Sequence, residues 1–133
     1  MIRNVVLIDD DAAVLESLEA VFTSAGFQVR AFALAADFLA ELYGLSPSCI
    51  VTDLRMPEID GLRLLDLLKG ELGVNWPVIV ISGHADAPEA LAARRAGAID
   101  FLIKPFAPQR LLAIVNACFH DHFGMFAGTA TVN

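Results

Sequence analysis

Several polar residues come directly after short apolar runs, which is where the strands of a parallel sheet would end. They are Asp9, Asp10, Asp53, Ser82 and Lys104. Carboxylates that converge in one crevice repel one another unless a hard divalent cation joins them, and Mg²⁺ prefers such oxygen ligands. The sequence therefore predicts a Mg²⁺ site that includes Asp9, Asp10 and Asp53.

A carboxylate beside such a cation can act as a nucleophile toward phosphorus. Attack by Asp53 would give an aspartyl phosphate, whose oxygens the metal and Lys104 would neutralise. The pattern therefore favours phosphoryl transfer to Asp53.

These residues need a fold that brings separate strand ends together. Five short apolar runs, rich in β-branched residues, predict strands. They are Val5–Ile8, Phe27–Ala31, Cys49–Thr52, Val78–Ile81 and Ile99–Ile103. Apolar residues with helical spacing predict five helices between and after these runs. The first contains Val14 to Phe22, and the others are Asp37–Leu42, Leu62–Leu72, Pro88–Ala96 and Pro108–His120.

Strands that alternate with helices favour a parallel sheet, because each right-handed crossover needs a helix on a sheet face. We expect an α/β fold with a doubly wound, five-stranded parallel sheet of order 2-1-3-4-5 and five helices, flavodoxin-like. Phe27–Ala31 alternates apolar and polar residues and is the expected edge strand. Ligands of such sheets bind beyond the carboxyl ends of the strands, where Asp53 and Lys104 are expected.

Composition narrows the function classes. The chain has 133 residues, a formal charge of -7 and only nine Lys and Arg residues, which argues against direct nucleic-acid binding. No apolar run is long enough to span a bilayer, so we expect no membrane contact and a cytoplasmic location. Cys49 and Cys118 are expected to be buried free thiols. We expect one domain over residues 1–123 and a disordered tail over 124–133.

Short motifs accompany the polar residues. They are Met56-Pro57 and Asp60-Gly61 after Asp53, and Pro105-Phe106 after Lys104. With them, the chain from Val5 to Phe119 resembles the response-regulator receiver domains of two-component systems. The run from Ser82 to Asp86, Ala96-Gly97-Ala98 and Asp100-Phe101 are similar to the FixJ-like branch, whose members usually carry a helix-turn-helix output domain. The resemblance implies phosphorelay signal transduction by a transcriptional regulator.

The resemblance implies that Asp53 accepts a phosphoryl group from a phosphohistidine of a sensor histidine kinase or phosphotransfer protein, and later loses it to water. The chain would be an enzyme only toward itself. By the same resemblance, Asp10, Asp53 and the main-chain carbonyl of Arg55 bind Mg²⁺ directly, and Asp9 acts through metal-bound water.

The resemblance also implies a switch. Lys104 would pair with the phosphoryl group, Ser82 would bond one of its oxygens, and Phe101 would turn inward as Ser82 moves. The surface of the fourth helix, fifth strand and fifth helix would change, and in similar domains it often forms a symmetric dimer. The Lys104–Pro105 peptide bond is commonly cis in this family but X-Pro bonds are mostly trans, so its state stays open.

Some residues have more than one interpretation. Asp11 is expected to cap the first helix and is given no catalytic role. Arg55 and His84 lie two residues beyond Asp53 and Ser82, where they either tune attack by water or only form a solvated rim. Phe101 could equally be fixed core.

Two other functions compete with the switch. A phosphohydrolase acting through Asp53 would usually place a second acid two residues later, where this sequence has Arg55. An interaction module independent of phosphorylation would be favoured by the loss of Asp53 or Lys104, and both are present.

Overall fold

The computed structural model describes residues 2–83 and 87–123. The strands are β1 (Asn4–Ile8), β2 (Gln28–Phe32), β3 (Cys49–Asp53), β4 (Val78–Ser82) and β5 (Asp100–Ile103). The α-helices are α1 (Ala12–Ser24), α2 (Ala35–Glu41), α3 (Gly61–Asp66), α4 (Ala87–Arg95) and α5 (Pro108–Asp121). A 3₁₀ turn, η1 (Leu42–Gly44), follows α2, and a π-helix, η2 (Leu67–Glu71), follows α3. Within these described ranges no helix combines the length and apolar character that a membrane span requires.

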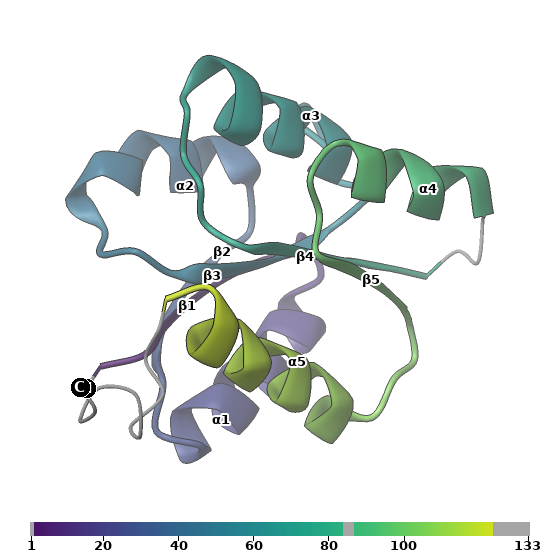
Figure 1. Ribbon diagram of the computed structural model, residues 1–133. Coiled ribbons are helices and arrows are strands. Elements are labelled where there is room, and N and C mark those ends of the chain that lie inside the picture. The colour runs from purple at the N-terminus through teal and green to yellow at the C-terminus, as the bar shows by residue number, and fades with distance from the viewer. Residues whose placement is uncertain (1, 84–86, 124–133) are drawn as a thin grey trace.

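The strands form one parallel sheet in the order β2-β1-β3-β4-β5, which confirms the predicted doubly wound topology. Helices α2, α3 and α4 cover one face of this sheet, and α1 and α5 cover the other (Figure 1). The central strands β3 and β4 are buried along their whole length, because helices cover both of their faces. In β2 exposed and less exposed residues alternate, as expected for the edge strand.

The core consists of two apolar clusters, one on each face of the sheet. Successive side chains of a strand point to opposite faces, so Val78 and Val80 join the cluster under α2, α3 and α4. Ile79 and Ile81 join the cluster against α1 and α5. Each strand is therefore held from both sides, which fixes where its carboxyl end lies.

The third helical segment differs from the single helix expected over Leu62–Leu72. The α-helix ends at Asp66 and continues as the π-helix η2. Its wider turn is closed by the N–H of Leu72, which donates to the carbonyl of Leu67 at 2.8 Å. A π-helical turn contains about one residue more than an α-helical turn, and apolar residues repeat with a similar spacing in both. The pattern of leucines therefore does not distinguish a π-helix from an α-helix. The second helix begins at Ala35, two residues before the expected start, and has no side-chain cap.

The two cysteines are free and buried, as expected. Both belong to the apolar cluster against α1 and α5. A hydrogen bond with Cys118 and burial together raise the pKa of the Cys49 thiol, so Cys49 stays protonated at neutral pH.

Candidate functional site

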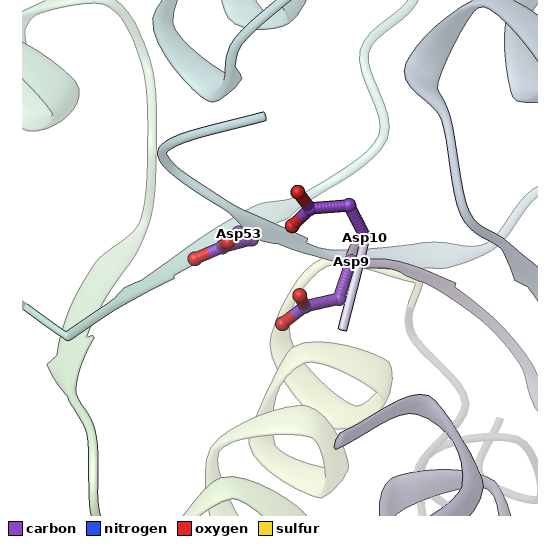
Figure 2. A group of neighbouring side chains, drawn as sticks. All are labelled: Asp9, Asp10 and Asp53. Carbon is purple, nitrogen blue, oxygen red and sulfur yellow. The ribbon is translucent and has the colours of Figure 1, made fainter. Parts of the chain in front are cut away.

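Three carboxylates meet at the carboxyl ends of β1 and β3. Asp9 and Asp10 follow β1, and Asp53 is the last residue of β3. Since Ile8 of β1 stands opposite Thr52 of the adjacent parallel strand, the residues after them lie side by side. One oxygen from each of the three acids lies within 4.8 Å of the others, and their side chains gather at the same place in Figure 2.

The three acids differ in their surroundings. Asp9 is only 1% exposed and Asp53 only 7%, whereas Asp10 is exposed. The carboxylate of Asp9 is held on both sides: its Oδ1 accepts the N–H of Asp11 at 2.9 Å, and its Oδ2 accepts from Lys104 at 2.9 Å. Asp9 is thus a fixed buried charge, while Asp10 faces solvent.

Lys104 supplies the positive charge of the site. Its Nζ lies 2.9 Å from Asp9 Oδ2 and 3.4 Å from Asp53 Oδ1. Its backbone N–H donates to the carbonyl of Ser82 at 2.7 Å, and the Lys104–Pro105 peptide bond is cis. Burial alone would lower the pKa of Lys104, but the hydrogen bond and attraction to Asp9, with help from Asp53, outweigh burial and raise it. The amine therefore stays charged.

Asp53 carries a charge that its surroundings only partly balance. Burial is the main cause that raises the pKa of its carboxyl group, and repulsion by Asp9 adds to it; attraction to Lys104 opposes both. A hard cation among the three acids would relieve this repulsion. The grouping of oxygen donors, one of them open to solvent, fits Mg²⁺.

Ser82 and Phe101 lie on neighbouring strands and on the same face of the sheet. Ser82 ends β4 and is 1% exposed. Phe101 of β5 stands opposite Val80, two residues before Ser82, and is partly buried against the cluster under α2, α3 and α4. The structure thus places the predicted switch pair on the side of the sheet that α4 covers.

Arg55 has an exposed side chain that forms an ion pair. Its guanidinium lies 2.5 Å from Glu89 Oε2, in the first turn of α4. Residue spacing does not indicate this pair, because an acid in a first helical turn is already explained by the helix dipole. His84, the other expected rim residue, lies outside the described residues.

The loop after Asp53 returns very close to the end of β3. The N–H of Gly61 donates to the carbonyl of Leu54 at 2.8 Å. A Cβ at Gly61 would lie 2.8 Å from the carbonyl oxygen of Asp53 and 3.0 Å from Cα of Leu54. Sequence reasoning missed this contact, whose only trace is the glycine itself.

The first helix begins as expected. Asp11 accepts hydrogen bonds from the N–H groups of Ala13 at 3.0 Å and Val14 at 3.4 Å, which confirms it as the cap of α1. The carboxylate of Asp11 therefore caps the N-terminus of α1.

A mostly apolar hollow of about 360 Å³ adjoins Lys104. It lies between α1 and the segment that joins β5 to α5. Its lining is Ala13, Val14, Ser17, Leu18, Lys104, Pro105, Phe106 and Pro108. The hollow thus places apolar side chains of α1 beside the lysine that pairs with Asp9 and Asp53.

Comparison with known proteins agrees with this geometry. The family described as "Response regulator receiver domain" matches residues 5–116. The transcriptional regulatory protein FixJ of Bradyrhizobium diazoefficiens is 44% identical over 118 residues, which cover 89% of this chain and 57% of FixJ. The chain thus spans little more than half of that relative.

Solved structures show the same likeness. The crystal structure of FixJ-N is 38% identical, with a TM-score of 0.83 over 91% of this chain and 96% of the other. The beryllofluoride-activated NtrC4 receiver domain dimer is 30% identical, with a TM-score of 0.82 over 89% and 97%. Since the family match spans most of the sequence and the fold agrees, the chain belongs to the response regulator receiver domain family.

Proposed function

We propose that Asp53 accepts a phosphoryl group from a phosphohistidine of a sensor histidine kinase or phosphotransfer protein. The observation that carries this proposal is the position of Asp53, within 4.8 Å of Asp9 and Asp10 oxygens and 3.4 Å from Lys104. An oxygen of Asp53 attacks phosphorus, the nitrogen–phosphorus bond breaks, and the leaving imidazole retains or takes up a proton. Water later attacks phosphorus, and Asp53 leaves as a carboxylate with release of inorganic phosphate.

Receiver domains are not enzymes in the usual sense and generally depend on Mg²⁺. In this proposal Asp10, Asp53 and the carbonyl of Arg55 would hold Mg²⁺ directly, and Asp9 would act through metal-bound water. The cation would supply charge neutralisation for the phosphoryl oxygens. Self-catalysed phosphorylation and dephosphorylation of Asp53 form part of the same proposal.

The residues of the chain have separate tasks in this reaction. Asp53 is the nucleophile, and Lys104, already held between Asp9 and Asp53, pairs with the phosphoryl group. The hydroxyl of Ser82 bonds another phosphoryl oxygen. As Ser82 moves toward it, Phe101 turns inward on the same face of the sheet, and the population shifts between two states.

The surface of α4, β5 and α5 carries the output in this proposal. It exposes two large apolar side chains, Leu91 at 49% and Ile103 at 44%. Arg94 and Asp100 pair at 2.9 Å within the same chain, at the edge of this surface. Apolar residues beside charged ones suit a symmetric interface between two copies, and the similar NtrC4 receiver is a dimer when beryllofluoride-activated.

The hollow beside Lys104 suits a protein donor. Its apolar lining on α1 lies next to the amine that would meet the incoming phosphoryl group. A donor protein that contacts this surface would bring its phosphohistidine close to Asp53. This placement supports a kinase or phosphotransfer protein as the source of phosphate.

The place of the chain in a larger protein is also a proposal. We assign the receiver to residues 1–123 and treat 124–133, outside the described residues, as a tail. Similarity to FixJ supports control of a transcriptional regulator, with no direct nucleic-acid contact by this acidic chain. Free thiols at Cys49 and Cys118 are compatible with the cytoplasm.

The test uses phosphoramidate, whose nitrogen–phosphorus bond is of the kind found in phosphohistidine. Incubation with Mg²⁺ should add one phosphoryl group to the chain by intact mass, and Asp53→Asn should remove that adduct. Omission of Mg²⁺ should also remove it. Sustained release of phosphate from small phosphate esters would instead indicate a phosphohydrolase, and an adduct that survives Asp53→Asn would refute the assigned acceptor.

A further inference from the structure

An ion pair connects the loop after Asp53 to the first turn of α4. Arg55 lies two residues beyond the proposed acceptor, and Glu89 lies 34 residues further along the chain. Their side chains meet at 2.5 Å. The pair therefore joins the site of phosphorylation to one element of the proposed output surface.

The ion pair with Arg55 satisfies only one of the two carboxylate oxygens of Glu89. The side chain of Glu89 is 22% exposed, and its Oε2 accepts from Arg55. Its Oε1 is buried and has no hydrogen-bond partner among the residues that the structure describes. A buried carboxylate oxygen without a partner is costly, so the Arg55 contact offsets only part of the cost of burying Glu89.

Arg55 is free to move to another anion. Its side chain is 55% exposed, and one nitrogen of its guanidinium makes the contact with Glu89. A phosphoryl group carries about two negative charges and three acceptor oxygens, against one charge on a carboxylate. Arginine binds phosphate through paired N–H groups, which one oxygen of Glu89 does not match.

We propose that Arg55 exchanges Glu89 for the phosphoryl group on Asp53, an inference that rests on the proposed function. The exchange adds a second cation beside Lys104 and at the same time releases the first turn of α4. Because the two anions compete for one guanidinium, the phosphoryl group weakens the Arg55–Glu89 pair by the same factor by which that pair weakens binding of the phosphoryl group. The pair thus couples Asp53 to α4 by a route separate from Ser82 and Phe101.

The competition can be measured with beryllofluoride, which activates the similar NtrC4 receiver domain. Affinity for beryllofluoride in the presence of Mg²⁺ is measured by calorimetric titration of wild type, Glu89→Gln, Arg55→Met and the double variant. Glu89→Gln should bind roughly two- to fivefold more tightly, the scale of one part-exposed ion pair. In the Arg55→Met background the same change should have no effect.

Two controls accompany the titrations. Glu41→Gln removes the acid of another Arg–Glu pair, that of Arg30 with Glu41 on β2 and α2, and should leave the affinity unchanged. Thermal unfolding of each variant shows whether it is folded. In wild type, the NMR signal of the Arg55 side chain should shift when beryllofluoride binds. The dependence of the Glu89→Gln gain on Arg55 is the readout that a purely structural role for Arg55 would not give.

The outcomes separate the two proposals. Binding by wild type that Asp53→Asn abolishes, with no gain in Glu89→Gln, would overturn the exchange and leave the proposed function standing. An equal gain in the presence and absence of Arg55 would also overturn it, because Glu89 would then act through its charge alone. Failure of wild type to bind beryllofluoride at Asp53 would overturn the proposed function and the exchange together.

Discussion

Asp9, Asp10 and Asp11 are three identical side chains in a row, and the end of β1 gives them three different environments. Asp9 is buried and bonded to Lys104, Asp10 is exposed next to Asp53, and Asp11 accepts from the N–H groups that open α1. The chain turns from strand to helix within these residues, so neighbouring carboxylates point in different directions. Residue type alone therefore does not assign their roles.

This difference predicts opposite results for two adjacent alanine variants. Asp11→Ala removes the cap of α1 and should lower the free energy of unfolding by about 1 kcal/mol, with Mg²⁺ affinity little changed. Asp10→Ala should leave the stability within about 0.5 kcal/mol and weaken Mg²⁺ binding by roughly tenfold or more. Thermal unfolding and calorimetric titration with Mg²⁺ measure the two effects. Equal Mg²⁺ affinity in Asp10→Ala and wild type would exclude Asp10 as a ligand.

Because Asp53 is a buried ionisable group, we expect the free energy of unfolding of the chain to depend on pH. Burial, reinforced by Asp9, raises the pKa of Asp53 above its ordinary value of 3.8, so the folded chain binds this proton more tightly than the unfolded chain. Ionised Asp53 therefore opposes folding at every pH above its folded pKa, and this opposition disappears below 3.8. With EDTA at pH 7, Asp53→Asn should unfold a few degrees higher than wild type, about 1 kcal/mol.

Thermal unfolding of wild type and Asp53→Asn over a range of pH tests whether the raised pKa of Asp53 causes this difference in stability. The advantage of Asp53→Asn should shrink as the pH falls and should vanish well below 3.8, where the wild-type carboxyl is protonated in both states. Mg²⁺ at neutral pH should stabilise wild type more than Asp53→Asn, because it relieves the repulsion from Asp9. A variant no more stable than wild type in EDTA would show that Lys104 already balances the charge.

At the scale of elements, the start of α3 determines where the proposed acceptor lies. Asp60 caps this helix by accepting the N–H of Arg63 at 2.8 Å, and Gly61 then packs against the backbone of Asp53 and Leu54. The contact leaves no space for a side chain. Helix α3 thus holds the end of β3 in place as well as covering the sheet.

Gly61→Ala tests this contact. A methyl group 2.8 Å from the Asp53 carbonyl oxygen must push the two segments apart, which should cost about 1–3 kcal/mol of stability and slow phosphorylation by phosphoramidate. Gly70→Ala is the matched control, since nothing lies within 4 Å of its added Cβ. It should be neutral or stabilising by up to about 1 kcal/mol and leave phosphorylation unchanged. If Gly61→Ala changed neither the stability nor the rate of phosphorylation, the loop between Asp53 and Gly61 would have space for the added methyl group.

At the scale of the whole molecule, the proposed chemistry and the proposed output surface lie on different elements. Asp53 lies at the carboxyl ends of the strands, whereas Leu91 on α4 and Ile103 at the end of β5 lie on the surface. Phe101 and Ser82 share the sheet face under α4, between these two regions. A change at Asp53 can thus reach the surface through packed side chains.

Dimerisation tests the output surface. Beryllofluoride with Mg²⁺ should convert the chain to a dimer in light scattering after size exclusion, and Leu91→Glu should weaken the dimer by roughly tenfold or more, because it places a charge in an apolar contact. Tyr43→Glu is the control: Tyr43 is 81% exposed on η1, outside that surface, and the variant should still dimerise. A Leu91→Glu dimer of normal strength would place the interface elsewhere.

The sequence by itself determined the fold and the grouping of the polar residues. Strands that alternate with helices favour a parallel sheet, and the carboxyl ends of parallel strands meet at one edge. Residues as distant as Asp9, Asp53 and Lys104 could therefore be predicted to converge. Asp11 could be identified as a cap because capping depends on local spacing. These conclusions depend on the periodic spacing of apolar and polar residues along a strand or helix, which can be read directly from the sequence.

Only the tertiary structure decided which groups touch. It placed Lys104 nearer to Asp9 than to Asp53, paired Arg55 with Glu89, and set Gly61 against the Asp53 backbone. It also converted the end of the third helix into a π turn and made the Lys104–Pro105 bond cis. Such contacts join residues far apart in the chain and depend on differences of a few tenths of an ångström, which packing sets and residue spacing does not encode.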